Sequence, residues 1–163
     1  MFVKNEVTVN NAVILDFIEP GTLVDGELEL MLIECYAGNA QLRLAPAYRF
    51  KMANTHDGRA MGRIELRLGN SENLRMYAGH IGYRVHEAFR GRHYAARAVQ
   101  LLVPLARYHQ LGTLWITCNP ENLASRRSCE LAGLTFTEIV KVPPSSDMYA
   151  MGDRQKCRYQ MVL

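Results

Sequence analysis

The chain has 163 residues, a formal net charge of +3, and 48% hydrophobic against 21% charged residues. This composition is typical of a globular protein, and the length suits a single domain, residues 1–163, with its own core. No apolar run approaches the roughly 20 residues that would span a bilayer, so we expect no membrane partner. The start of the chain lacks the features of a secretory signal, which favours a cytoplasmic location. The small net charge does not indicate a nucleic-acid partner.

The four cysteines of the chain are scattered and form no CxxC pair. This spacing argues against a zinc cluster and against a disulfide framework, so we expect free thiols and no metal site. The cysteines are Cys35, Cys118, Cys129 and Cys157.

The first half of the chain predicts strands joined by turns. Asp57-Gly58 marks a hairpin turn within Asn54–Gly58. The segment Glu34–Pro46 leaves room for one short helix at most. The strands predicted here are Leu28–Ile33, Ala47–Met52, Gly62–Leu68 and the long Leu74–Val85.

The second half alternates helices with strands. A helix is predicted at Ala95–Gln110, where small and apolar residues recur at three- and four-residue spacing. Pro104 should kink this helix or leave a carbonyl free. A second helix, Leu123–Ala132, follows Asn122 as a candidate cap. Strands are predicted at Thr113–Thr117, Thr135–Val142 and Lys156–Val162, with a loop at Pro143–Asp153.

This order of elements predicts an α+β fold with α/β-like features. Its core is a mixed, mostly antiparallel central sheet with flanking helices. The right-handed crossover rule places Thr113–Thr117 parallel to Leu74–Val85, with the long helix covering the sheet.

The segment Gly79–Ala98 carries the strongest chemical signal in the chain. An apolar strand leads into a basic turn, which opens the predicted helix. Free N–H groups and the helix dipole favour an anion at such a junction, and Arg90 and Arg92 add formal charge. The pattern therefore predicts phosphate binding.

A second segment, Cys118–Leu134, follows about thirty residues later, and together the two segments resemble the GNAT superfamily of acyl-CoA-dependent N-acetyltransferases. Arg90 and Ala95 match the ends of the family's glycine-containing signature, and His93 stands at a glycine position. Asn122 and Ser125 match the second motif. Gly133-Leu134 matches its closing Gly-Phe, with Leu for Phe. The resemblance covers roughly residues 60–140.

The resemblance implies a GNAT-like fold in which the parallel strands splay apart to admit the pantetheine arm of acetyl-CoA. The implied activity is acetyl transfer from acetyl-CoA to a primary amine of a small molecule or peptide. Backbone amides of Tyr83 and Val85 would position the thioester. The other implied cofactor-binding residues are Arg90, Gly91, Arg92, His93, Tyr94, Ala95, Ala96, Asn122 and Ser125.

His93 needs a helical backbone if its N–H is to point at phosphate, because a left-handed conformation suits glycine far better than histidine. We therefore expect a right-handed backbone at this position.

Amine attack on a thioester is helped by a general base and a general acid. His80 is the first candidate for the base, since its ordinary pKa of about 6.5 suits work near neutrality. It should point to the opposite face of the strand from Tyr83, so it needs a bulge or a site on its own face. Glu65, on the adjacent predicted strand, is the second candidate.

For the acid, the resemblance points to Cys129, where the family usually has tyrosine. A thiol could protonate a leaving thiolate, but a cysteine at such a position is more often a small, buried apolar residue. Tyr94, Tyr149 or Tyr159 could serve instead. An acyl-carrying role of Cys129 would require ping-pong kinetics.

Two other classes stay open at the level of sequence. The chain could bind acyl-CoA without turnover, as a sensor or regulatory module. RNA binding through the arginines is another hypothesis, although the aromatic spacing of an RNA-recognition sheet is missing. The oligomeric state is open, a homodimer included.

Overall fold

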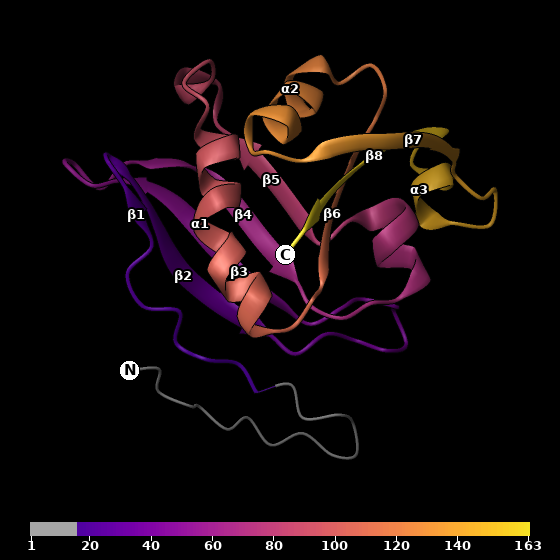
Figure 1. Cartoon of the computed structure of the whole chain (residues 1–163), viewed down its shortest axis with the longest axis horizontal. Helices are drawn as coiled ribbons and strands as arrows, with labels where there is room; N and C mark the ends of the chain where they lie inside the picture. Colours follow the sequence, from indigo (N-terminus) through magenta and orange to yellow (C-terminus); the bar gives the residue numbers. More distant parts are fainter. Residues whose placement is uncertain (1–15) are drawn as a thin grey trace.

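The computed structural model describes residues 16–163, in which two antiparallel sheets lie next to each other with helices around them (Figure 1). The expectation about a secretory signal falls mainly on residues outside this range. The first sheet has the strand order β1 (Val24–Asp25), β2 (Leu28–Tyr36), β3 (Ala47–Asn54), β4 (Ala60–Arg67) and β5 (Ile81–Val85). The second has the order β6 (Thr113–Cys118), β8 (Gln155–Val162) and β7 (Thr135–Lys141).

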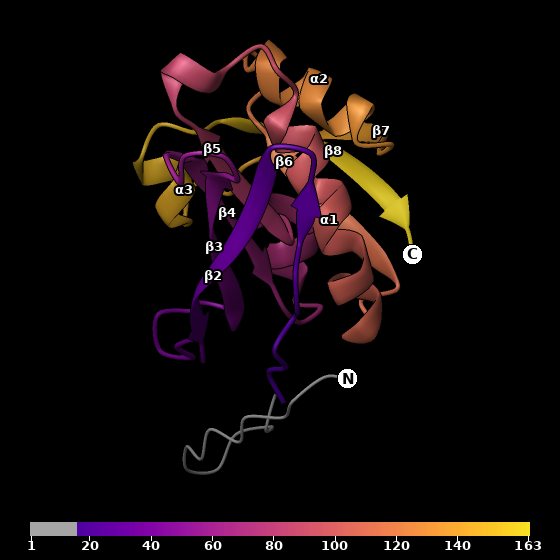
Figure 2. The ribbon, with the colours of Figure 1, turned by 90° about the vertical axis from the view of Figure 1, so that its left-hand side faces the viewer.

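Helix α1 (Tyr94–Tyr108) lies beside one face of the five-stranded sheet (Figure 2). It buries the predicted apolar stripe, including Ala98, Val99 and Leu102, against strand residues such as Phe50 and Ile64. The helix continues through Pro104. Because strand side chains alternate between the two faces, the polar residues of β3, β4 and β5 lie on the face away from α1.

Helix α2 (Leu123–Leu131) follows β6, and Asn122 caps it as predicted, since its Oδ1 accepts from Ser125 N at 3.0 Å. The predicted loop at 143–153 contains a short helix, α3 (Asp147–Ala150). The segment 34–46 holds no helix: β2 continues to Tyr36, and a bridge between Asn39 and Leu44 closes the turn. None of the helices formed by residues 16–163 combines the length and apolar character needed to cross a bilayer.

The predicted long strand Leu74–Val85 is wrong in its first half. Leu74–Ala78 forms one helical turn, and β5 begins at Ile81. Gly79 separates the two with a φ of 74°. A Cβ added there would lie 3.1 Å from the backbone nitrogen of Thr117, so the chain needs glycine to pass this close to β6.

The expected parallel pair is not present as a ladder. Every strand pair that residues 16–163 form is antiparallel, and β5 and β6 belong to different sheets. The two sheets are linked near the start of β5, where His80 N donates to Trp115 O at 2.6 Å. Beyond this link β5 is an edge strand, so part of its backbone is free to bind a ligand.

Candidate active site

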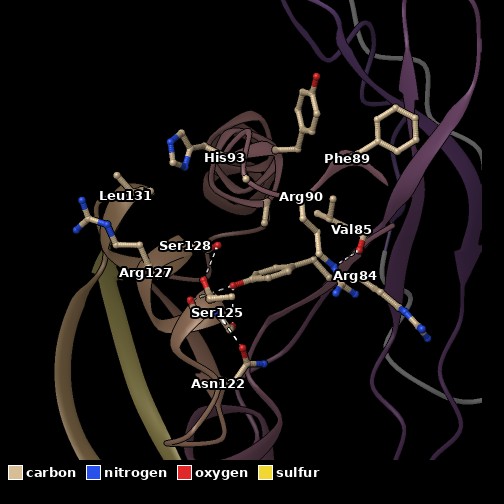
Figure 3. A pocket seen from close by; sticks show the side chains of 15 residues that line it. Arg84, Val85, Phe89, Arg90, His93, Asn122, Ser125, Arg127, Ser128 and Leu131 are labelled. Atoms are coloured by element: carbon tan, nitrogen blue, oxygen red, sulfur yellow. Dashed lines mark hydrogen bonds between the residues drawn. The ribbon is translucent and has the colours of Figure 1, made fainter. Parts of the chain in front are cut away.

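A cavity of about 540 Å³ lies between β5, the turn before α1, and α2 (Figure 3). Nine of the predicted cofactor-binding residues line it, whereas Arg92 and Ala96 do not. The nine are Tyr83, Val85, Arg90, Gly91, His93, Tyr94, Ala95, Asn122 and Ser125. The two motif segments, separated in sequence, thus face the same space.

The start of α1 offers unpaired donors to this cavity. The first N–H groups of a helix have no partner within it, and His93 makes no side-chain cap. Ala95 and Tyr94 line the cavity at this end, where the helix dipole favours an anion. The junction therefore has the donors that a phosphate group requires.

The prediction of a right-handed backbone at His93 is wrong. Its φ of 60° and ψ of 21° place it in the left-handed region. The chain must turn sharply there to enter α1, and Gly91, with a φ of 79°, is also left-handed. His93 thus keeps a conformation natural to glycine, at a conformational cost that glycine would not have.

Arg90 bends back toward β5, where its Nε donates to the carbonyl oxygen of Val85 at 3.2 Å (Figure 3). Arg90 lines the cavity, so its guanidinium adds positive charge beside the start of α1. Arg92 is exposed outside the cavity lining. The two arginines, both predicted to bind the cofactor, therefore differ in their relation to the cavity.

The free edge of β5 presents the amides of Tyr83 and Val85. Arg67 N donates to His80 O, and His86 N donates to Met61 O, which fixes the register of hydrogen bonding with β4. Since bonding alternates along an antiparallel pair, Tyr83 and Val85 direct their backbone groups away from β4. Their predicted role as thioester-positioning amides fits this geometry.

Helix α2 lines the cavity with more residues than the motif predicted. Ser125 lies next to Asn122 in Figure 3, and its Oγ is 2.8 Å from the Tyr83 hydroxyl. Ser128 and Leu131 follow at helical spacing, a signal that could have been found by continuing the face from Ser125. The residues missed in the sequence are Arg84, Phe89, Ala124, Arg127, Ser128 and Leu131.

Tyr83 stands where three cavities meet. Besides the first, it lines a second of about 700 Å³ over β3 to β5 and a third of about 360 Å³ beside β6. Burial raises the pKa of its phenol, because desolvation disfavours the phenolate. The hydroxyl therefore holds its proton beside Ser125, which lines the first and third cavities.

Cys129 lies behind Tyr83 and is almost fully buried, with its Sγ 4.0 Å from the Tyr83 hydroxyl. It lines none of the three cavities. A hydrogen bond with Cys118, together with burial, raises the pKa of the Cys129 thiol. This environment favours an uncharged packing residue over a nucleophile.

His80 does not reach a cavity. It is fully buried, its Nδ1 accepts from Trp115 N at 2.9 Å, and its Nε2 lies 3.1 Å from Gly69 O. Burial lowers its pKa. With both ring nitrogens engaged, His80 is placed to hold the two sheets together, and the geometry does not support its predicted role as the base.

Glu65 lines the second cavity and reaches toward β5. It pairs with Arg67, and its Oε2 lies 3.5 Å from Arg49 Nε. Gly82 faces it across the ladder, and a Cβ on Gly82 would come within 2.8 Å of Arg67 Nη2. The missing side chain lets the Glu65–Arg67 pair lie over the strand next to Tyr83.

The other candidate acids lie outside the three cavities or have a different partner. The Tyr94 hydroxyl donates to Glu27 at 2.7 Å, and Tyr159 is fully buried and accepts from Arg126. Tyr149 lies on α3 beneath the Arg154 guanidinium. Tyr83, which was not a predicted acid, is the tyrosine that lines all three of these cavities.

The fold resembles those of solved acetyltransferases. One is a putative ribosomal-protein-serine acetyltransferase from Vibrio cholerae, with 17% identity, a TM-score of 0.63, and coverage of 88% of this chain and 99% of the other. The microcin C7 self-immunity acetyltransferase MccE, solved with acetyl-CoA and AMP, has 15% identity, a TM-score of 0.56, and coverage of 72% and 61%. RimL, a ribosomal L7/L12 alpha-N-protein acetyltransferase solved with coenzyme A, has 18% identity, a TM-score of 0.54, and coverage of 72% and 62%.

No curated protein matches the chain in sequence. A family model described as an acetyltransferase (GNAT) domain matches residues 9–135, which is most of the chain. This span contains both motif segments and the cavity between them. The chain therefore belongs to the GNAT acetyltransferase family.

Proposed function

We propose that the protein transfers an acetyl group from acetyl-CoA to a primary amine, with the first cavity holding the cosubstrate and the second admitting the amine. The observation that carries this proposal is the position of Tyr83, which lines both cavities. A ligand in one cavity and a ligand in the other would meet at this residue. Proximity of this kind is a large part of the catalysis of group transfer.

The residues of the first cavity fit acetyl-CoA. The N–H groups at the start of α1 and the Arg90 guanidinium suit a pyrophosphate. The outward amides of Tyr83 and Val85 suit a pantetheine arm and the thioester oxygen, because backbone donors stabilise the charge that develops there. Acetyl-CoA supplies the activated acetyl group, and the protein's own part is to bind and orient it.

For proton transfer we propose Glu65 as the group that accepts the proton of the amine. Its carboxylate lies in the second cavity beside Gly82 and Tyr83. Tyr83 is the proposed donor to the leaving thiolate, because its hydroxyl keeps its proton and contacts Ser125, which lines the first cavity. Cys129, predicted for this role, is buried with its Sγ 4.0 Å from the Tyr83 hydroxyl.

Isothermal calorimetry with acetyl-CoA tests the binding part. Arg90→Ala should weaken binding by about tenfold, since a charged group beside the phosphates is lost. Arg92→Ala is the matched control, because Arg92 lies outside the cavity, and it should bind as the unmodified protein does. Equal effects of both changes would contradict the assignment of the phosphate site.

Turnover measurements over a panel of amines and peptide N-termini test the chemical part. Tyr83→Phe keeps the ring and the backbone amide, so it should lower kcat by about 10²-fold and leave acetyl-CoA binding unchanged. Glu65→Gln should lower kcat/KM for the amine. If Tyr83→Phe keeps full activity and Cys129→Ser loses it, Cys129 and not Tyr83 is the general acid. Binding without turnover of any amine would favour a sensor.

A further inference from the structure

Three cations form a row on the open face of the five-stranded sheet, the face away from α1. The ladders place Lys51 of β3 directly opposite Arg63 of β4, and Arg63 directly opposite Arg84 of β5. Directly opposite residues point their side chains to the same face. Arg63 and Arg84 are exposed, and Lys51 is partly exposed.

None of the three has an ion pair or side-chain hydrogen bond with any residue in the range 16–163. The neighbouring row differs, because Arg49 pairs with Glu34 at 2.8 Å and Arg67 pairs with Glu65. Like charges directly opposite each other destabilise a sheet. An anionic ligand on the row would relieve this repulsion.

The row runs into the second cavity, which Arg63 and Arg84 line together with Glu65, Gly82 and Tyr83. This is the cavity proposed above for the amine. A molecule that holds its amine next to Glu65 therefore lies with the rest of its structure close to the row. The charges can then act on acceptor choice without touching the reacting atoms.

The extent of the row distinguishes a chain from a small anion. Neighbouring strands lie about 4.8 Å apart, so the outer members of the row start roughly 10 Å from each other. Carboxylates at alternate positions of an extended peptide are about 7 Å apart and can reach different cations of the row, whereas one phosphate cannot. Met31, which faces Lys51 on β2, and the nearby Ile33 are exposed by 42% and 65% and add apolar contacts.

We infer that the acceptor is the N-terminus of a polypeptide whose first residues are acidic, and that Lys51, Arg63 and Arg84 select it. This inference rests on the proposed function, since it names the substrate of the same site. Electrostatic contacts of exposed side chains act mainly on selection and on the rate of encounter. The selection should accordingly weaken as salt is added.

The test compares two peptides of about ten residues with free N-termini that differ in a run of Glu replaced by Gln. We expect kcat/KM to be about tenfold higher for the Glu peptide. The double change Lys51→Gln with Arg63→Gln should remove this preference without altering acetyl-CoA affinity, because neither residue lines the first cavity. Arg84 is left unchanged because it lines both cavities.

The matched control is Arg107→Gln with Lys141→Gln, which removes the same charge from exposed positions on α1 and β7. This control should keep the preference. Equal kcat/KM for the two peptides, or equal loss in both double variants, overturns the inference. Inorganic phosphate that competes as well as the Glu peptide at the same concentration also overturns it, because a small anion would then suffice.

Binding measured without turnover separates this inference from the proposed function. Fluorescence anisotropy of the Glu peptide, labelled at its C-terminus, should show binding that the Lys51→Gln, Arg63→Gln protein loses. Such binding with no acetylation of any peptide would support the acidic partner and contradict the transfer reaction. Acetylation with no dependence on Glu would contradict the acidic partner alone.

Discussion

His80 and Trp115 make two hydrogen bonds with each other across the boundary between the two sheets. The backbone N–H of His80 donates to Trp115 O at 2.6 Å, and the His80 Nδ1 accepts from Trp115 N at 2.9 Å. Because Nδ1 accepts, the proton is on Nε2, which donates to Gly69 O. A single neutral histidine thus joins three segments of the chain at the point where β5 and β6 begin to separate.

Removing the His80 ring should therefore affect stability more than catalysis. His80→Ala leaves the Trp115 N–H and the Gly69 carbonyl without partners in a buried position, which should cost about 1–3 kcal/mol in the free energy of unfolding. Urea denaturation measures this loss. The kcat of the folded variant, measured well below its melting temperature, should stay within about twofold, whereas loss of a general base would cost about 10²-fold or more. A large fall in kcat without loss of stability would restore His80 as the base.

The same contact predicts a pH dependence of stability. Burial lowers the pKa of His80, so below about pH 6.5 the unfolded chain takes up a proton that the folded protein resists. The contribution of His80 to the free energy of unfolding should be constant above about pH 7, and it should fall as the pH drops from about 6.5 to 5. Burial also lowers the pKa of His109, which contacts the Tyr48 hydroxyl at 2.8 Å.

Denaturation of His80→Gln and His109→Gln across this range separates the two histidines. Each change should reduce the slope of stability against pH, and the double change should nearly abolish it. An unaltered slope in His80→Gln would mean that His80 is not protected from protonation in the folded protein.

Glycine should be tolerated better than histidine at the start of α1. The left-handed backbone conformation of His93 is unfavourable for any residue with a side chain. His93→Gly should therefore raise the free energy of unfolding by about 0.5–1 kcal/mol. Gln110→Gly is the matched control, because Gln110 has a similar φ of 54° and lies outside the cavity. Both changes should raise the melting temperature. Destabilisation by His93→Gly alone would show that the imidazole makes contacts worth more than the strain.

A methyl group on Gly82 should disturb the acceptor side of the site. Gly82→Ala would press against Arg67 Nη2 and displace the guanidinium from Glu65. Because a flexible side chain can move, we expect a small change in melting temperature. The expected kinetic result is a several-fold rise in KM for the amine, with KM for acetyl-CoA unchanged. If the KM for the amine and the KM for acetyl-CoA rise equally, the substitution disturbs β5 as a whole and not the acceptor side alone.

Local patterns in the sequence predicted the structural features that depend on residues close together in the chain. The helical stripe of α1, the cap by Asn122 and the basic turn near Arg90 were each visible, because helical periodicity and capping act within a few residues. The two motif segments predicted a shared binding site, and nine of the eleven predicted cofactor-binding residues line the first cavity. Glu65, the second candidate for the base, lies in the adjoining cavity.

Strand register and the distance between the two sheets decided which side chains from distant parts of the sequence lie together. The backbone at Gly79 lies close to β6, which ends the predicted long strand there. His80 is therefore buried at the boundary between the two sheets. Pairing across β3, β4 and β5 aligned Lys51, Arg63 and Arg84, although they lie far apart in the sequence. The distance between β5 and α2 allows the Tyr83 hydroxyl to contact Ser125. Periodicity assigns a side chain to a face, but which side chains meet there depends on register and on the distance between elements.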